Sequence, residues 1–173
     1  MDAFLEIIKY ILPALIVFFT AYFSIRLLIK NDQKRRDFEI MVKNKNEITP
    51  IQLQAYERLT LFLERISPDA LVMRLNKENM TSQQLQNEIL KTIRAEFDHN
   101  LSQQVYISSK AWEMIKHAKE RTIKLINTTA TAVKPDAPAI HLSKAVLEKV
   151  AEQDEIATRT AIEYLKKEVR NYF

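Results

Sequence analysis

The apolar positions of this chain divide it into two parts, and the first is a continuous apolar segment near the N-terminus. The sixteen residues between Lys9 and Arg26, YILPALIVFFTAYFSI, carry no charge, and the wider window Phe4–Ile29 holds only three charges. The segment has no polar face, which an amphipathic core helix would show. Sixteen helical residues rise about 24 Å, and the apolar flanks extend this toward the ~30 Å hydrocarbon layer of a bilayer. The pattern therefore predicts a single transmembrane helix, with a buried core helix as the alternative.

The charges around this segment predict its orientation. Lys9 is the only basic residue before the apolar run, where Asp2 and Glu6 also lie, and no small-residue cleavage site follows the run, which disfavours a secretion signal. The C-terminal side carries these basic residues: Arg26, Lys30, Lys34, Arg35, Arg36, Lys43 and Lys45. Because basic residues stay on the cytoplasmic side of a span, we expect the N-terminus outside and the long remainder in the cytoplasm.

Two features of this region suggest contacts with the membrane. Lys34, Arg35 and Arg36 form a basic cluster that could bind anionic lipid headgroups. Acidic neighbours dilute the cluster, so a plain solvated surface is an equal alternative. Thr20 and Ser24 lie four residues apart and have the spacing of small-residue pairs through which membrane helices pack together.

The rest of the chain repeats apolar residues at three- and four-residue spacing, which predicts amphipathic helices. Thr49-Pro50 has the composition of a helix start, and Ser67-Pro68 that of a second, short helix. Thr81 and Gln84 form a capping box before a third helical run. Residues 105–109 weaken that run, and a serine there could start a new helix. Whether 81–133 is one bent helix or two folded back stays open.

Two prolines predict a loop over residues 134–142, after which Ser143 could cap a C-terminal helix. The narrow apolar seam of this helix consists of Val146, Val150, Ala157, Ala161, Leu165 and Val169. So narrow a seam suits packing on a helix of similar length, either 109–133 or a neighbouring chain.

These patterns together predict an all-α fold, with an N-terminal transmembrane helix followed by a cytoplasmic helical bundle or long antiparallel hairpin. The predicted parts are a membrane anchor (1–30), a charged juxtamembrane linker (31–48), a helical bundle (49–133), the proline-containing loop (134–142) and an amphipathic C-terminal helix (143–173).

The amino-acid composition disfavours several classes of function. The chain has no glycine and no cysteine, so phosphate-cradling loops, thiol nucleophiles and thiolate metal sites are disfavoured. The net charge of +4 is too small to indicate a nucleic-acid partner. No catalytic motif is present, and we expect neither an enzyme nor a cofactor nor a small-molecule substrate.

One pattern argues weakly for a metal. Glu96 and His99 have the Glu-x-x-His spacing of di-iron bundles, and Glu113 and His117 form a second carboxylate–imidazole pair. Further inward-facing glutamates, which such a site requires, are not evident. Ordinary surface positions are therefore favoured for all four residues, and no metal site is predicted.

The candidates for contact with a partner lie in the second part of the chain. Trp112 is expected in the core, with an anchor for a partner as the alternative. The polar run HNLSQQ at 99–104, including His99 and Gln103, is either a buried polar network or a docking face. The seam around Leu165 is a third candidate.

Four segments resemble an uncharacterised family of helical membrane proteins from Bacteroidetes bacteria. They are QAYERLTLFLERISP at 54–68, LVMRL at 71–75, EFDHNLSQQVYIS at 96–108 and AWEMIKHAKE at 111–120. The resemblance implies a single-pass protein of a bacterial inner membrane, with a periplasmic N-terminus and a helical cytoplasmic region, and it implies no catalytic residues. We therefore expect a non-enzymatic accessory subunit or scaffold of an inner-membrane complex, such as a secretion, motility or transport machine. The alternative is a self-associating, membrane-tethered coiled coil that contacts anionic lipid.

Overall fold

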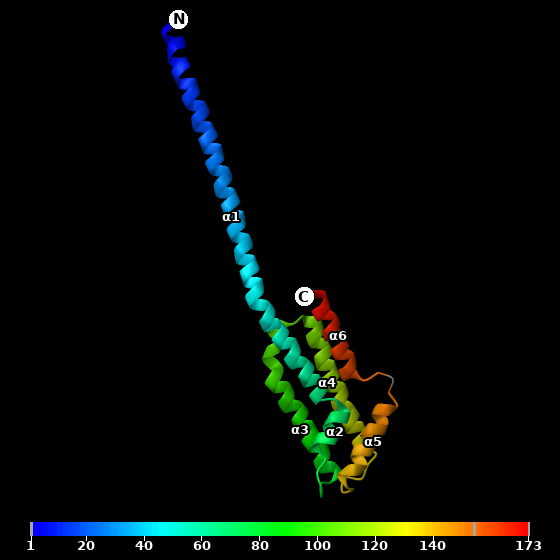
Figure 1. Ribbon diagram of the computed structural model, residues 1–173. Helices are drawn as coiled ribbons and strands as arrows, with labels where there is room; N and C mark the ends of the chain where they lie inside the picture. The colour runs from blue at the N-terminus through cyan, green and yellow to red at the C-terminus, as the bar shows by residue number, and fades with distance from the viewer. Residues whose placement is uncertain (1, 154, 173) are drawn as a thin grey trace. The chain divides into compact units, whose positions relative to one another are not determined.

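The computed structural model describes the backbone of residues 2–153 and 155–172, with side chains for 15–43, 47–153 and 155–171. Its elements are α1 (Asp2–Arg65), α2 (Pro68–Leu75), α3 (Ser82–Asn100), the 3-10 helix η1 (Leu101–Tyr106), α4 (Ser109–Ala130), α5 (Ala139–Ala151) and α6 (Ala157–Tyr172) (Figure 1). The described residues contain no strand beyond one isolated bridge. The prediction of an all-α fold is confirmed. The chain divides into two compact units, Met1–Thr49 and Pro50–Phe173.

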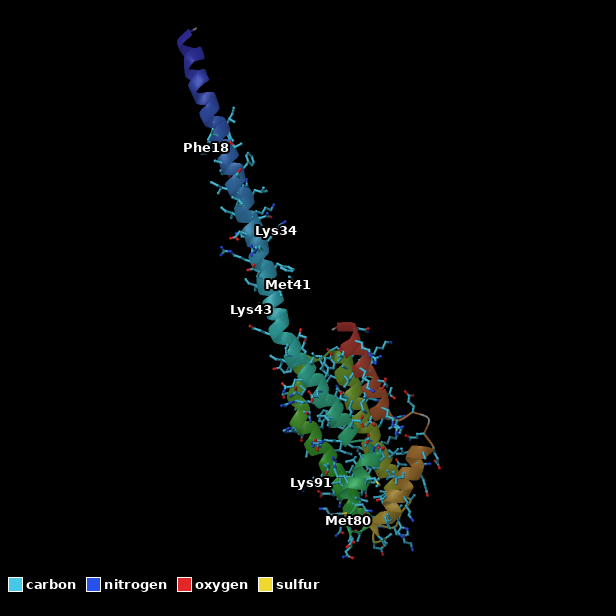
Figure 2. The ribbon with its side chains drawn as sticks, in the orientation of Figure 1. Phe18, Lys34, Met41, Lys43, Met80 and Lys91 are labelled. Carbon is cyan, nitrogen blue, oxygen red and sulfur yellow. The ribbon has the colours of Figure 1, made fainter. Side chains whose placement is uncertain are left out.

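The first unit is the N-terminal part of α1. Between Leu15 and Ile29 its large apolar side chains are exposed, and because successive helical residues point in different directions, they occupy every side of the helix. Phe18 projects from the ribbon in this segment (Figure 2). Among the residues whose side chains are described, no helix carries an apolar stretch long enough to cross a bilayer. That finding does not cover residues 1–14 of the predicted anchor, 1–30, because the structure describes no side chains for them.

The prediction that a helix begins at Thr49-Pro50 is wrong, because α1 runs through both residues. The predicted linker, 31–48, is likewise helical. Proline has the φ of a helix, and its cost inside one, about 3 kcal/mol, comes from the lost amide and a clash with the carbonyl four residues earlier. Helix-forming residues lie on both sides of this point, so Thr49-Pro50 marks a weak point of α1 and not its start.

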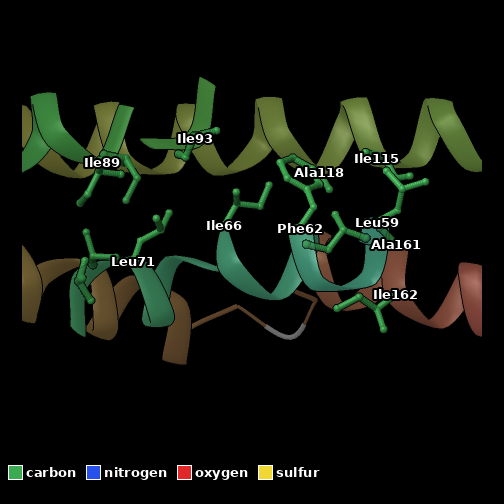
Figure 3. Packing of buried hydrophobic residues seen from close by; sticks show 14 of the residues in the cluster. Leu59, Phe62, Ile66, Leu71, Ile89, Ile93, Ile115, Ala118, Ala161 and Ile162 are labelled. Carbon is green, nitrogen blue, oxygen red and sulfur yellow. The ribbon is translucent and has the colours of Figure 1, made fainter. Parts of the chain in front are cut away.

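The second unit is a bundle of two layers. One layer is the hairpin of α3 and α4, which pack together after η1 reverses the chain, so residues 81–133 form two helices. The other layer holds the last turns of α1 together with α2, α5 and α6. Figure 3 shows Ile93 and Ile115 of the hairpin facing Ile66, Leu59 and Ala161 of the second layer, all of them fully buried.

Two helix starts in this unit follow the sequence prediction. The Gln84 amide donates to Thr81 Oγ1 (3.2 Å), and the Thr81 amide donates to Gln84 Oε1 (3.0 Å), which completes the capping box of α3. The Ser108 hydroxyl accepts a hydrogen bond from the Ala111 amide (3.0 Å) and so caps α4. Each cap satisfies amides that the first helical turn leaves without a partner.

The predicted loop 134–142 is shorter than expected, because α5 begins at Ala139. Pro138 is the residue before the helix and does not exclude it, since proline is compatible with helix starts. The Ala139 amide donates to the Met80 carbonyl (2.8 Å), which ties this start to the segment before α3. Ser143, predicted as a cap, is buried inside α5, where its hydroxyl donates to the Ala139 carbonyl (3.2 Å).

The predicted single helix 143–173 is also wrong, since the chain breaks between Ala151 and Ala157 into α5 and α6. The break lets the two helices bury their apolar faces in different places. α5 packs on α2, α3 and α4, whereas α6 packs on α4. A straight continuation of α5 could not cover both surfaces, and this tertiary demand outweighs a local sequence that favours helix.

Candidate functional site

Trp112 lies within an aromatic row in the core of the bundle. Its ring stacks on Phe97 with centroids 5.4 Å apart, and Phe97 in turn lies 5.9 Å from Phe62 of α1. The Lys119 ammonium lies 4.0 Å from the Phe97 ring centroid, at a distance typical of a cation–π contact. Only 9% of Trp112 is exposed. This agrees with the expectation of a core residue and leaves little of the indole for a partner.

Leu165 is also unavailable to a partner in this fold. It is 1% exposed, and α6 packs its apolar face on α4. Ala161 and Val146 of the predicted seam are fully buried as well. These positions are apolar and inward-facing as predicted, but the break between α5 and α6 divides the seam between two helices, and the fold covers both parts from within the chain. This corrects the assignment of Leu165 to a partner interface.

The turn between α3 and α4 is an exposed surface of the second unit. Val105 is 76% exposed, and Leu101 and Tyr106 are exposed beside it in η1. His99 lies on the same stretch with its side chain exposed, and Gln103 is half-buried. We call residues 99–106 the η1 surface; Asn100 within it is buried. The surface exposes three apolar side chains and carries no Asp, Glu, Lys or Arg, and exposed apolar groups without such charges are typical of a protein interface.

Sequence reasoning found the η1 surface only in part. The polar run 99–104 indicated a docking face or a buried network, and the exposure of His99 favours the face. Leu101 follows Phe97 at the four-residue spacing of a buried helical stripe, but the helix ends at Asn100 and the chain turns into η1, which leaves Leu101 exposed. Val105 and Tyr106 were read only as helix-weakening residues. An apolar residue within a predicted turn is the signal that could have identified them.

The two carboxylates of the weak metal pattern pair with basic side chains instead. The Arg65 guanidinium donates to both oxygens of Glu96 (3.2 and 3.3 Å), and the Lys116 ammonium lies 2.6 Å from Glu113. His99 and His117 are exposed. In the described part of the chain no three histidine or carboxylate side chains converge as metal ligands would.

The basic cluster of the first unit is partly neutralised within the helix. The Arg35 guanidinium donates to Glu39 (2.9 Å), and Arg36 donates to Asp32 (2.8 Å), both at i,i+4 spacing. Such exposed pairs contribute little to stability, so a lipid phosphate could displace them at small cost. Lys34 and Lys43 extend from the same segment of α1 (Figure 2).

Thr20 and Ser24 share one side of α1 and line a shallow groove. Its other lining residues are Leu15, Ile16, Phe19 and Phe23. The Thr20 hydroxyl donates to the carbonyls of Ile16 (2.5 Å) and Val17 (3.1 Å), so its polar group is satisfied within the helix. A hydroxyl satisfied in this way lets a second helix approach closely without an unmet hydrogen bond.

Comparison with known proteins gives one match. No curated protein and no solved structure is significantly similar to this chain. A family of unknown function is similar over residues 2–172, which is nearly the whole length. The match agrees with the resemblance to an uncharacterised family. On this evidence the chain belongs to the family of unknown function DUF7935.

Proposed function

We propose that this protein is a non-enzymatic accessory subunit or scaffold of an inner-membrane complex. In this proposal residues 1–30 form a single membrane anchor with a periplasmic N-terminus. The helical bundle lies in the cytoplasm and presents docking surfaces to integral membrane partners. Neither a cofactor nor a nucleic acid takes part in this function.

The observation that carries the proposal is the exposure of large apolar side chains on every side of α1 between Leu15 and Ile29, where Arg26 is the one charged residue. Monomeric proteins in water rarely expose contiguous apolar surface of this extent, because burying it is worth ~25 cal/mol per Å². A bilayer would cover such a surface on all sides at once, whereas one packed helix would cover only one side. The seven basic residues from Arg26 to Lys45 support the cytoplasmic placement of the bundle.

Replacement of Phe18 by lysine tests the membrane anchor. A lysine near the centre of a span costs about 2.5–3.5 kcal/mol on insertion scales, so we expect a large loss of the chain from alkali-washed membranes. Phe38→Lys introduces the same change on the same helix outside the expected span and should leave the membrane fraction unchanged. If both variants stay with the membranes as the unchanged chain does, residues 1–30 are not the anchor.

The absence of cysteine offers a clean test of topology. A single cysteine placed at Lys43 should be labelled by a membrane-impermeant thiol reagent only after the cells are opened. A single cysteine at Asp2 should be labelled in intact cells once the outer membrane is permeabilised. The reverse pattern would place the bundle in the periplasm and contradict the proposed orientation.

A second candidate function, a self-associating membrane-tethered coiled coil, is favoured by a specific observation. Phe38, Met41 and Ile48 are all more than half exposed, and their spacings of three and seven residues match one face of a helix. Chemical cross-linking of the purified chain separates the two candidates. A homo-oligomer that is lost on Met41→Asp would favour self-association, whereas a monomer that co-purifies with a membrane protein would favour the subunit.

A further inference from the structure

A pocket of about 210 Å³ lies within the second unit, where α2, α4, α5 and α6 meet. Three basic side chains and two buried threonines are among the residues that line it: Arg121, Lys124, Lys149, Thr122 and Thr129. The sequence analysis did not predict this pocket, because its residues come from helices that are distant in sequence and lie on no single motif.

The two threonines provide the first indication of a ligand. Thr122 is 3% exposed and Thr129 is 7% exposed, so both are embedded in the bundle. Neither hydroxyl forms a hydrogen bond with any described residue. Neither hydroxyl is sealed from solvent either, in contrast to that of Thr158. Both threonines line the pocket, so a ligand bound there lies next to them. A buried hydroxyl without a partner is costly unless water or a ligand satisfies it.

The cations provide the second indication. Arg121 and Lys124 form no ion pair with any residue that the structure describes. They lie three residues apart on α4 and project from one face of it, although like charges at this spacing repel each other. Lys149, across the pocket on α5, holds Glu152 at 2.7 Å, and this hydrogen bond raises the pKa of Lys149. The ion pair with Glu152 offsets much of the charge of Lys149, so Arg121 and Lys124 supply most of the positive charge at the pocket.

Helix termini add to the positive potential. Pro68 and Ala157, the first residues of α2 and α6, both line the pocket. The side chain of Ser67 does not cap α2, so the first-turn N–H groups of that helix keep their partial positive charge, although Pro68 itself has no N–H and Asp69 in the same turn offsets part of this charge. One group opposes an anion, since Glu155 also lines the pocket and its Oε1 accepts a hydrogen bond from the Thr160 hydroxyl (3.0 Å).

From the unpaired cations, the unpartnered hydroxyls and the two helix starts, we infer that this pocket binds the phosphate group of a small phosphorylated ligand or lipid. Arg121 and Lys124 bind its charged oxygens, and the hydroxyls of Thr122 and Thr129 donate to it. The inference goes beyond the proposed scaffold function and does not depend on it. A scaffold that carries such a site would sense a phosphorylated ligand through contacts between α4, α5 and α6.

Titration of the full chain with inorganic phosphate, in mild detergent and at constant ionic strength, tests the site. We expect saturable binding that raises the midpoint of thermal unfolding. The double variant Arg121→Gln/Lys124→Gln should weaken phosphate binding about tenfold or more, because two charge-assisted contacts are removed. The control Lys110→Gln/Lys144→Gln removes two exposed charges from α4 and α5 outside the pocket and should bind as the unchanged chain does. Equal weakening in both double variants, or no saturable binding by the unchanged chain, would overturn the inference.

The variant Glu155→Gln should change the affinity for phosphate in the opposite direction. Loss of this negative charge should strengthen phosphate binding several-fold, since like charges at the pocket then no longer repel each other. An unchanged affinity would show that the anion binds away from Glu155 and would contradict the site.

Reconstitution identifies the source of the phosphate group. If a lipid headgroup occupies the pocket, the chain in vesicles of phosphatidic acid should no longer respond to added phosphate, whereas the chain in phosphatidylcholine vesicles should. An equal response in both kinds of vesicle would identify a free phosphorylated ligand. Both results support the site. No response in either would contradict it.

Discussion

Replacement of Phe62 by alanine should lower the free energy of unfolding of the bundle by about 3–5 kcal/mol. Phe62 is almost fully buried between the two layers, and its ring lies 5.9 Å from that of Phe97. The alanine variant loses both the transfer free energy of the ring and the contacts around the cavity that remains. Since Phe97 stacks on Trp112, the loss should also loosen the aromatic row beyond it.

Trp112 makes this loss measurable, because it is the only tryptophan of the chain and its fluorescence reports on the aromatic row. Chemical unfolding of the full chain in mild detergent, followed at this residue, should show a lower midpoint for Phe62→Ala. The matched control is Leu61→Ala, since Leu61 is the preceding residue of α1 and is more than half exposed. It should change stability by less than about 0.5 kcal/mol. Equal losses in the two variants would mean that α1 does not pack in the bundle through Phe62.

The features that sequence predicted well are those controlled by neighbouring residues. The capping box of Thr81 and Gln84 and the cap at Ser108 each depend on a hydrogen bond across three residues, which local sequence is enough to specify. The apolar stripes were predicted for the same reason, since helical periodicity places Leu59, Phe62 and Ile66 on one face.

The features that sequence missed depend on distant parts of the chain. Nothing between Ala151 and Ala157 breaks a helix locally, since this stretch contains neither proline nor glycine. The break follows from the need of α5 to pack on α2 and α3 while α6 packs on α4. At Pro50 the error is the reverse, since local sequence predicted a helix boundary that the fold does not have. Its local signal for a helix start is strong, but a proline can also lie within a helix at some cost in stability.

The candidate surfaces also divide into features set by neighbouring residues and features set by distant parts of the chain. Periodicity identified Leu165 as part of a seam, but periodicity cannot tell whether the seam is covered by the same chain or by a partner. The η1 surface and the phosphate pocket depend on which side chains the fold leaves uncovered. Val105 is open because η1 ends the packing of α3, and the hydroxyls of Thr122 and Thr129 lack partners because four helices meet around a gap.

Replacement of Leu165 by alanine distinguishes an internal seam from a docking surface. If α6 packs on α4 of the same chain, the variant should lose about 2–5 kcal/mol of stability, and its unfolding midpoint should not depend on protein concentration. Lys167→Ala is the control, because Lys167 is exposed two residues further along the same helix, and its loss should change stability by less than about 0.5 kcal/mol. A seam that bound a partner would behave differently. The isolated variant would then be as stable as the unchanged chain and would lose only the partner. A partner should therefore be sought at the η1 surface or along α1, where apolar side chains remain exposed.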